Sequence, residues 1–177
     1  TNVACQLQAL KYLPRFSDAW CNLGTSMTAG ETVNVNGKDY TKRGCYLEAL
    51  EYNPQHINTW LNLGNVISAG ESVSVNGKDY TQRACCLQAL EHNPQNSDAW
   101  NNLGIGMSAC ETVNVNDKHY TQRGCYLQAL EHNPQSSFAW HKLGIGMAAG
   151  ESVIVNGTNC SSADCIACAQ VFVESLY

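Results

Sequence analysis

The pattern of apolar and polar positions along this chain alternates between a helical period and a strand period. Apolar residues recur every three positions in residues 2–13, which predicts a helix that ends before Pro14. A second helix is expected over residues 17–29, with Ser17 or Asp18 as its capping residue. The same helical spacing returns further along the chain, so helices are the main predicted element.

A short alternating stretch follows the second helix. Residues 31–40 alternate in the manner of a strand on both sides of Asn36-Gly37. Asn-Gly favours a tight β-hairpin, because both turn positions need a positive φ. The turn recurs as Asn76-Gly77, Asn116-Asp117 and Asn156-Gly157. Each alternating stretch therefore predicts a small hairpin or tight loop, after which a residue such as Thr41 caps the next helix.

These elements repeat with a period of 40 residues. The period is marked by the tryptophans Trp20, Trp60, Trp100 and Trp140, and by the prolines Pro14, Pro54, Pro94 and Pro134. Such self-similarity predicts a stacked repeat array. We expect one array over residues 1–177, with nine helices in all. It consists of an unpaired first helix at 1–16, full repeats at 17–56, 57–96 and 97–136, and a divergent terminal repeat at 137–177.

One glycine lies in the middle of each predicted first helix, at Gly24, Gly64, Gly104 and Gly144. Glycine in a helix interior costs about 0.8–1 kcal/mol relative to alanine. Its recurrence predicts that another helix packs closely there. The tryptophans four residues earlier are expected to be buried anchors of the helix pairs.

Charge and composition exclude several classes of function. The net charge is −5 and the basic residues form no cluster, which argues against nucleic-acid binding. No stretch approaches the roughly 20 apolar residues of a membrane-spanning helix. The histidines and acids form no catalytic arrangement, and no phosphate-binding loop is present. We therefore predict a protein that is not an enzyme, needs no cofactor and does not insert into a membrane.

The ten cysteines fall into two sets. One set keeps the period, at Cys5, Cys45, Cys85, Cys125 and Cys165, and is expected to be buried thiols. The other set breaks the period and supplies the candidates for disulfides, at Cys21, Cys86, Cys110, Cys160 and Cys168. Zinc binding by Cys165, Cys168 and Cys160 is a weak alternative, because no histidine stands at ligand spacing. No metal site is predicted.

The segments Ala99-Trp-Asn-Asn-Leu-Gly104 and Tyr126-Leu-Gln-Ala-Leu-Glu-His-Asn-Pro134 together resemble the tetratricopeptide repeat. The resemblance implies an all-α solenoid, in which antiparallel helix pairs form a right-handed superhelix with a concave groove. It also implies binding of peptides or proteins in that groove, and no catalysis. The unit of 40 residues exceeds the family's 34, which the inserted hairpin explains. Lys42-Arg43 also stands where the family usually has a small residue.

Polar residues two positions after each tryptophan are the candidates for peptide binding, namely Asn22, Asn62, Asn102 and Lys142. An asparagine amide can donate to and accept from one extended backbone unit. A row of asparagines could thus hold a peptide, and Lys142 would end the row. The alternative is that these amides are simply satisfied by water.

Two charged series accompany the hairpins, Arg43, Arg83 and Arg123, and Glu31, Glu71, Glu111 and Glu151. Opposite charges could pair between neighbouring repeats, although an exposed pair contributes only about 0–1 kcal/mol. We expect these charges to serve solubility and register.

Two triplets, at Asn156 and at Asn159, fit the acceptor pattern for N-glycosylation in the last hairpin. Together with the irregular cysteines they favour an extracellular, secreted protein, with the cytoplasm as the alternative. The chain opens in mid-repeat without an initiator methionine, so we expect a mature or trimmed product.

Two hypotheses for function follow. In the first, the chain associates with itself end to end into a homo-oligomer or fibre, through the apolar last helix that carries Phe172, Leu176 and Tyr177. In the second, it is a scaffold that holds an extended peptide or partner protein through its asparagines.

Overall fold

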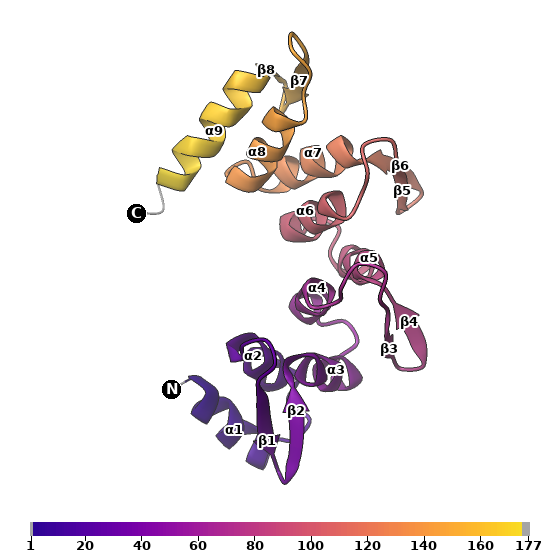
Figure 1. Cartoon of the computed structure of the whole chain (residues 1–177), viewed down its shortest axis with the longest axis vertical. Helices are drawn as coiled ribbons and strands as arrows, with labels where there is room; N and C mark the ends of the chain where they lie inside the picture. Colours follow the sequence, from indigo (N-terminus) through magenta and orange to yellow (C-terminus); the bar gives the residue numbers. More distant parts are fainter. Residues whose placement is uncertain (1, 175–177) are drawn as a thin grey trace. The chain divides into compact units, whose positions relative to one another are not determined.

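The computed structural model describes residues 2–174, and the side chains of residues 2–173. Helices and two-stranded hairpins alternate along the chain (Figure 1). The contacts between residues divide the chain into two compact units, Thr1–His92 and Asn93–Tyr177. The single array over residues 1–177 stays a prediction, and each unit is described by itself below.

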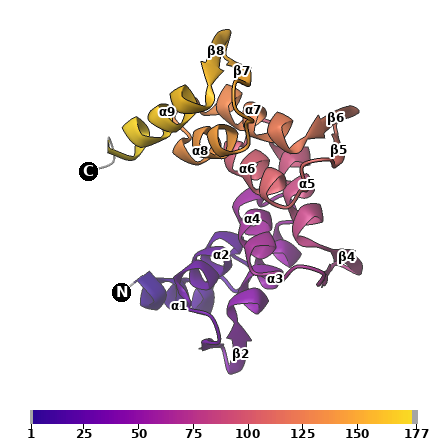
Figure 2. The same ribbon diagram turned by 45° about the horizontal axis from the view of Figure 1, so that its top comes forward.

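The N-terminal unit contains five helices and two hairpins. Its elements are α1 (Asn2–Tyr12), α2 (Ser17–Ser26), β1 (Thr32–Val35), β2 (Lys38–Thr41), α3 (Lys42–Tyr52), α4 (Ile57–Asn65), β3 (Val73–Val75), β4 (Lys78–Tyr80) and α5 (Gln82–His92). Consecutive helices from α1 to α5 pack against one another, and each hairpin extends outward from the helices that it joins (Figure 2).

The C-terminal unit contains four helices and two hairpins. Its elements are α6 (Ser97–Ile105), β5 (Thr112–Val115), β6 (Lys118–Thr121), α7 (Gln122–His132), α8 (Ser137–Ile145), β7 (Ser152–Val155), β8 (Thr158–Ser161) and α9 (Ser162–Glu174). Over residues 2–174 the number of helices is the nine that the sequence predicts. The first helix of a repeat is shorter than predicted, however, since α2 ends at Ser26. Met27 takes an extended conformation there, and its side chain is buried.

The predicted hairpins are confirmed as antiparallel strand pairs. In the first hairpin Val33 lies opposite Tyr40, and the turn residues Asn36 and Gly37 have φ values of 50° and 89°. The third copy forms the same kind of turn without glycine, because Asn116 and Asp117 both adopt a positive φ. Asparagine and aspartate tolerate the left-handed region better than most residues, which explains why this copy remains a hairpin.

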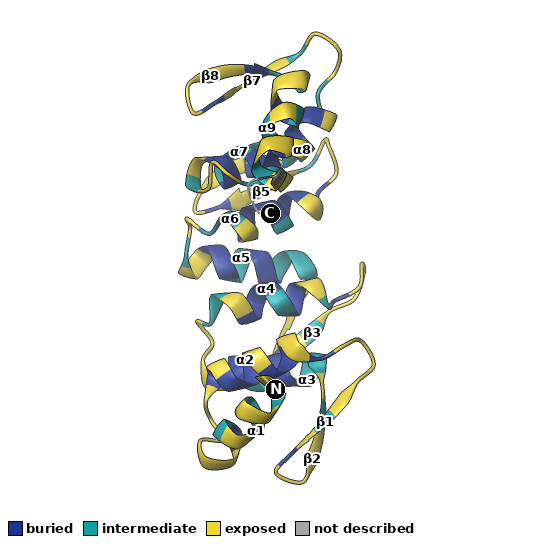
Figure 3. Cartoon of the chain, turned by 90° about the vertical axis from the view of Figure 1, so that its left-hand side faces the viewer, coloured by how far each residue is buried: buried dark blue, intermediate teal, exposed yellow. Residues whose placement is uncertain are grey.

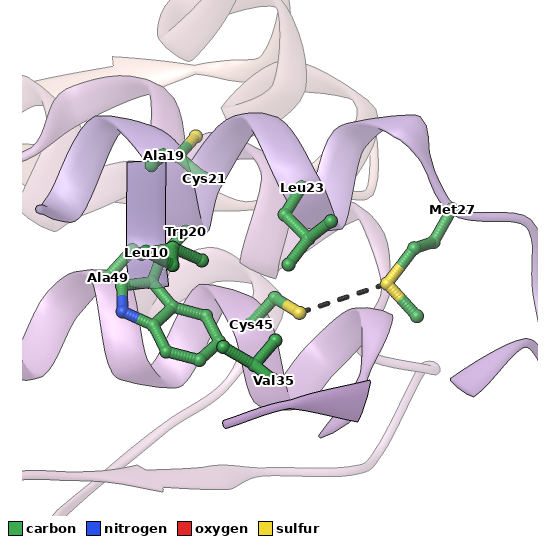
Figure 4. Packing of buried hydrophobic residues seen from close by; sticks show 9 residues of the cluster. All are labelled: Leu10, Ala19, Trp20, Cys21, Leu23, Met27, Val35, Cys45 and Ala49. Atoms are coloured by element: carbon green, nitrogen blue, oxygen red, sulfur yellow. Dashed lines mark hydrogen bonds between the residues drawn. The ribbon is translucent and has the colours of Figure 1, made fainter. Parts of the chain in front are cut away.

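The buried residues face neighbouring helices, whereas the hairpins are largely exposed (Figure 3). Trp20 belongs to the first cluster, which also contains Leu10, Leu23 and Cys45 (Figure 4). The indole Nε1 of Trp20 donates a hydrogen bond of 2.7 Å to the carbonyl oxygen of Pro14. The other three tryptophans make the same bond to the proline six residues earlier. The proline thus ends one helix and also holds the anchor of the next.

The hairpins are fastened to the helices through the same tryptophans. The rings of Trp20 and Tyr40 lie 4.7 Å apart, and so do those of Trp60 and Tyr80. The third repeat has the same contact. In the last repeat Cys160 takes the place of the tyrosine. The hairpin insertion is therefore part of the packed repeat and not a loose appendage.

The recurrent glycines lie where two helices of one repeat come closest. A Cβ atom at Gly24 would lie 2.7 Å from the ring of Tyr46, and one at Gly144 would lie 2.7 Å from Ile166. Such distances are well inside van der Waals contact, so any side chain would force the helices or the ring to shift. At Gly64 the contact is looser, at 3.2 Å from the Cβ of Cys85.

Four of the five periodic cysteines, Cys45, Cys85, Cys125 and Cys165, are fully buried, as predicted. Burial raises the pKa of the Cys45 thiol to about 12. The prediction is wrong for Cys5, which is exposed. In α3 the cysteine packs beside Gly24 of α2, whereas on α1 no helix among residues 2–174 covers the equivalent face.

Side-chain caps are present at most helix starts. Thr41 accepts a hydrogen bond from the backbone N–H of Gly44, as predicted. The prediction that Ser17 or Asp18 caps α2 is wrong, because the capping position is Phe16, which makes no side-chain cap bond. Ser17 is instead buried and donates to the carbonyl oxygen of Ala49. The equivalent positions of the later repeats do supply caps, at His56, Asn96 and Ser136.

Restoring this missing cap should stabilise the N-terminal unit. We expect Phe16→Ser to raise the free energy of unfolding by about 0.5–2 kcal/mol, because serine can accept from the orphan N–H groups of α2. Urea denaturation followed by circular dichroism measures the change. The matched variant Asn96→Ala removes an existing cap, the bond from the Ala99 N–H, and should lower stability by a similar amount. If Phe16→Ser lowered the free energy of unfolding as Asn96→Ala does, this account would be contradicted.

Candidate functional site

Within residues 2–174, no helix is both long and apolar enough to span a membrane. The same part of the chain contains no group of three or more histidines, cysteines or acids that could hold a metal ion.

The candidate peptide-binding residues lie in both units. Asn22 is exposed on α2, whereas Asn62 on α4 is half-buried. The Asn62 amide nitrogen donates to Thr25 Oγ1 at 3.2 Å and lies 3.8 Å from Cys21 Sγ. This amide thus joins the first helices of two neighbouring repeats. Binding of a peptide by these residues stays a prediction.

In the C-terminal unit Asn102 and Lys142 are both half-buried on the first helices of their repeats. The Lys142 ammonium lies 5.4 Å from the centroid of the Phe138 ring, one turn earlier on α8. This distance is within the range of a cation–π interaction. Lys142 also lines a pocket of about 260 Å³ with Arg123 and Tyr126.

Two arginines of the charged series pair with a glutamate of the next repeat, which the sequence allowed but did not favour as the main role of these charges. Arg43 donates to Glu71 at 3.2 Å and to the carbonyl oxygen of Val66 at 3.0 Å. Arg123 makes the equivalent contacts with Glu151 and with the Gly146 carbonyl oxygen. Each arginine therefore connects the second helix of one repeat with the end of the first helix of the next.

This pairing predicts a pH dependence in the C-terminal unit. The hydrogen bond from Arg123, with a further bond from the Ala148 N–H, lowers the pKa of Glu151 from 4.5 to about 2. A carboxylate with a lowered pKa in the folded state stabilises the fold above pH 4.5, and that contribution is lost as the pH falls towards 2. Glu151→Gln should lack this component of the acid response in thermal denaturation between pH 5 and pH 2. Identical pH profiles for the two proteins would refute the assignment.

Helices α8 and α9 pack side by side (Figure 2), and side chains of both line an apolar groove. Its volume is about 460 Å³, and it is lined by Ser137, Phe138, His141, Ile166, Ala169, Gln170 and Val173. Phe138 and Val173 are 39% and 46% exposed. We call this surface the α8/α9 groove.

In earlier repeats, two positions equivalent to residues of this groove contact the next repeat. Asp18, at the position of Phe138, has its carboxylate 2.8 Å from Nε2 of His56. Asn101, at the position of His141, donates to Ser136 Oγ at 3.1 Å. The α8/α9 groove thus includes positions at which one repeat contacts another. It is not a copy of the inner surface, because Gln170 replaces leucines that are fully buried in the other repeats, Leu10, Leu50, Leu90 and Leu130.

A second apolar surface lies on the turn between α1 and α2, residues 13–16. Leu13 and Phe16 are 61% and 43% exposed, and with Tyr12 and Arg15 they line a shallow hollow of about 440 Å³. At the position of Leu13 the other repeats have Asn53, Asn93 and Asn133, whose side chains accept from the N–H two residues later. The α1–α2 turn therefore has apolar residues in place of two polar, hydrogen-bonding ones.

Sequence reasoning missed both apolar surfaces. The signal was available, since placing the repeats in the register of 40 shows Phe138 among Asp18, Asn58 and Asp98, and Phe16 among His56, Asn96 and Ser136. At each of these two positions one repeat has a phenylalanine and the other three have a polar residue.

A family model described as tetratricopeptide repeat matches residues 85–105. The matched segment contains most of α5, the turn at Pro94 and the whole of α6 with Trp100 and Gly104. This segment is similar to the tetratricopeptide repeat. A comparison with curated proteins found no match.

Tetratricopeptide repeats generally mediate protein–protein interactions and are typically not enzymes. The two apolar surfaces, the α8/α9 groove and the α1–α2 turn, are accordingly the candidate contact sites for another protein. Contiguous exposed apolar surface is the usual mark of such a site.

The remaining candidate residues lie as follows. The candidates for disulfides are buried at Cys21, Cys86 and Cys160, half-buried at Cys168 and exposed at Cys110. Their pairing stays a prediction, as does glycosylation at the exposed residues Asn156 and Asn159 of the last hairpin. Among the proposed self-association residues Phe172 is half-buried on α9, whereas Leu176 and Tyr177 lie outside the described residues.

Proposed function

We propose that this chain is a non-enzymatic tetratricopeptide repeat protein that associates end to end with further copies of itself through the α8/α9 groove. The observation that supports this most is Phe138, an exposed aromatic residue at the position where Asp18 contacts the next repeat through His56. In this proposal both units continue one right-handed superhelical array of helix pairs.

The energetics favour contact with protein at this groove. Burying a large apolar side chain that is otherwise exposed contributes about 1.5–3 kcal/mol. Phe138 lies in the first turn of α8, where the aspartates of other repeats would interact favourably with the helix dipole. Phenylalanine gives up that interaction, and a contact that covers its ring offsets the loss.

The occupant that we propose is a second copy of the chain. Two residues of the groove, Phe138 and His141, occupy positions at which other repeats of this chain contact the next repeat. A surface of the same chain is therefore a suitable partner for the groove. A groove that binds a different surface of the next copy makes a heterologous contact, which yields an open series of oligomers or a filament.

This function predicts concentration-dependent assembly that Phe138→Asp abolishes. In sedimentation velocity, the weight-average mass of the wild-type chain should rise with concentration, whereas the variant should remain at the mass of one chain. Aspartate is the residue of Asp18 and Asp98 at this position, so the variant should fold. Ile154→Thr, on an exposed residue of β7, is the control and should assemble like the wild type. A wild-type chain that stays monomeric at high concentration would reject the proposal.

The alternative function, a scaffold that holds an extended peptide through its asparagines, has less support. The Asn62 amide already donates to Thr25 within the repeat array. Under this alternative Asn62→Ala with Asn102→Ala would abolish binding of a peptide partner and leave assembly unchanged.

A further inference from the structure

We propose that the pocket between the first turn of α7 and the second half of α8 binds a phosphate group, either as inorganic phosphate or as part of a small organic molecule. The groups that contact the anion are the Lys142 ammonium, the Arg123 guanidinium and the Tyr126 hydroxyl. All three belong to the C-terminal unit of one chain, so the pocket binds its ligand whether or not copies of the chain associate.

The residues that line this pocket combine positive charge with hydrogen-bond donors. Its volume of about 260 Å³ far exceeds the roughly 10–15 Å³ that one water molecule needs, so a phosphate group fits. Arg123 and Lys142 are its bases, and none of the described residues that line it is an acid. The pocket also lies at the first turn of α7, where the helix dipole favours negative charge.

Lys142 supplies a charge that the other repeats lack at this position. The equivalent residues are Asn22, Asn62 and Asn102. Among the residues that the structure describes, no carboxylate pairs with the Lys142 ammonium, which lies 5.4 Å from the centroid of the Phe138 ring. A half-buried ammonium has lost part of its hydration, so an anion in the adjoining pocket would stabilise it.

The hydroxyl of Tyr126 has no hydrogen-bond partner within the described part of the chain. Tyr126 is 5% exposed and lines the pocket. Its equivalent in the N-terminal unit, Tyr46, has a hydrogen bond with Thr25, whereas the residue at the position of Thr25 is here Ile105. Isoleucine offers no hydrogen bond. Since buried polar groups are as a rule hydrogen-bonded, a ligand in the pocket supplies the missing partner.

The N-terminal unit indicates that the hydroxyl and the ammonium lie close to each other. There Thr25 bonds with Tyr46 and also accepts from the Asn62 amide at 3.2 Å. Tyr126 and Lys142 occupy the positions of Tyr46 and Asn62 in the register of 40. Without the bridging threonine, both groups can bind to one anion between them.

Arg123 is only partly used by its contacts within the protein. It donates to Glu151 and to the carbonyl oxygen of Gly146, whereas a guanidinium has five N–H donors. Glu151 does not line the pocket, and with it counted the two bases still leave one positive charge. Arginine and lysine both bind phosphate groups, and donors from three side chains suit a phosphate because it offers more acceptor oxygens than a carboxylate.

A titration of the full-length chain with inorganic phosphate, at constant pH and ionic strength, tests the inference. We expect the backbone amides of residues 121–126 and 142–146 to shift towards saturation in two-dimensional NMR spectra. Lys142→Asn, which introduces the residue of the other repeats, should weaken binding tenfold or more, and Tyr126→Phe should weaken it about two- to tenfold. Lys118→Asn removes the same charge from an exposed residue of β6 and should leave the affinity unchanged. Circular dichroism checks that the variants fold.

Two further ligands identify the chemistry of the site. Acetate should bind much more weakly than phosphate, and glycerol phosphate shows which source of phosphate the pocket prefers. Tighter binding of glycerol phosphate assigns an organic phosphate, whereas equal or weaker binding assigns inorganic phosphate. The inference is overturned if the wild-type amides do not shift, if acetate binds as tightly as phosphate, or if Lys118→Asn weakens binding as much as Lys142→Asn.

Discussion

Replacing Trp60 with alanine should lower the free energy of unfolding by about 3–5 kcal/mol, a large part of the stability of a small domain. Trp60 is 2% exposed, and its indole donates to the carbonyl oxygen of Pro54 at 2.7 Å. Its ring also packs against Tyr80 at 4.7 Å between centroids, so the variant leaves a cavity and loosens the hairpin β3–β4. Urea denaturation followed by circular dichroism measures the loss.

Trp60→Phe is the matched control for this variant. It keeps an aromatic ring against Tyr80 but removes the N–H that donates to Pro54. We expect it to lose less than the alanine variant, since the ring still fills most of the site. A loss below about 1 kcal/mol for Trp60→Ala would contradict the role of tryptophan as the anchor of the helix pair.

Replacing Gly104 with alanine should destabilise the C-terminal unit by about 1–3 kcal/mol, although alanine is the better helix former. The new Cβ would lie 2.7 Å from Cε1 of Tyr126, whose ring is buried between α6 and α7. Thermal denaturation measures the change. Gly106→Ala is the control, because its Cβ would lie 3.7 Å from the nearest atom, an ordinary contact distance. Equal stability of the two variants would show that helix contact does not require glycine at Gly104.

The features that could be predicted from the sequence are those in which one residue type demands one geometry. Asn36-Gly37 needs a positive φ at two positions and therefore indicates the hairpin. A glycine such as Gly24 in a helix interior indicates the close approach that the structure places there. The helices follow from their spacing and from Thr41 as a cap.

Features that depend on neighbours could not be predicted in the same way. The burial of Cys45 and the exposure of Cys5 differ because only one of them has a helix packed on its face, and the two residues are alike in local sequence. The α8/α9 groove depends on α9 packing beside α8 and on the side chains from both helices that line it. Leu13 and Phe16 could be recognised in the sequence as apolar exceptions in the repeat. The contact between His56 and Asp18 at the equivalent position, however, is visible only in the structure.

Electron microscopy of the purified wild-type chain tests the central claim most directly. If the α8/α9 groove of one copy binds the next copy, particles should lengthen in one dimension as the concentration is raised, and the Phe138→Asp chain under the same conditions should show single short particles. Wild-type particles that remain of one size, indistinguishable from those of the variant at every concentration, would contradict it.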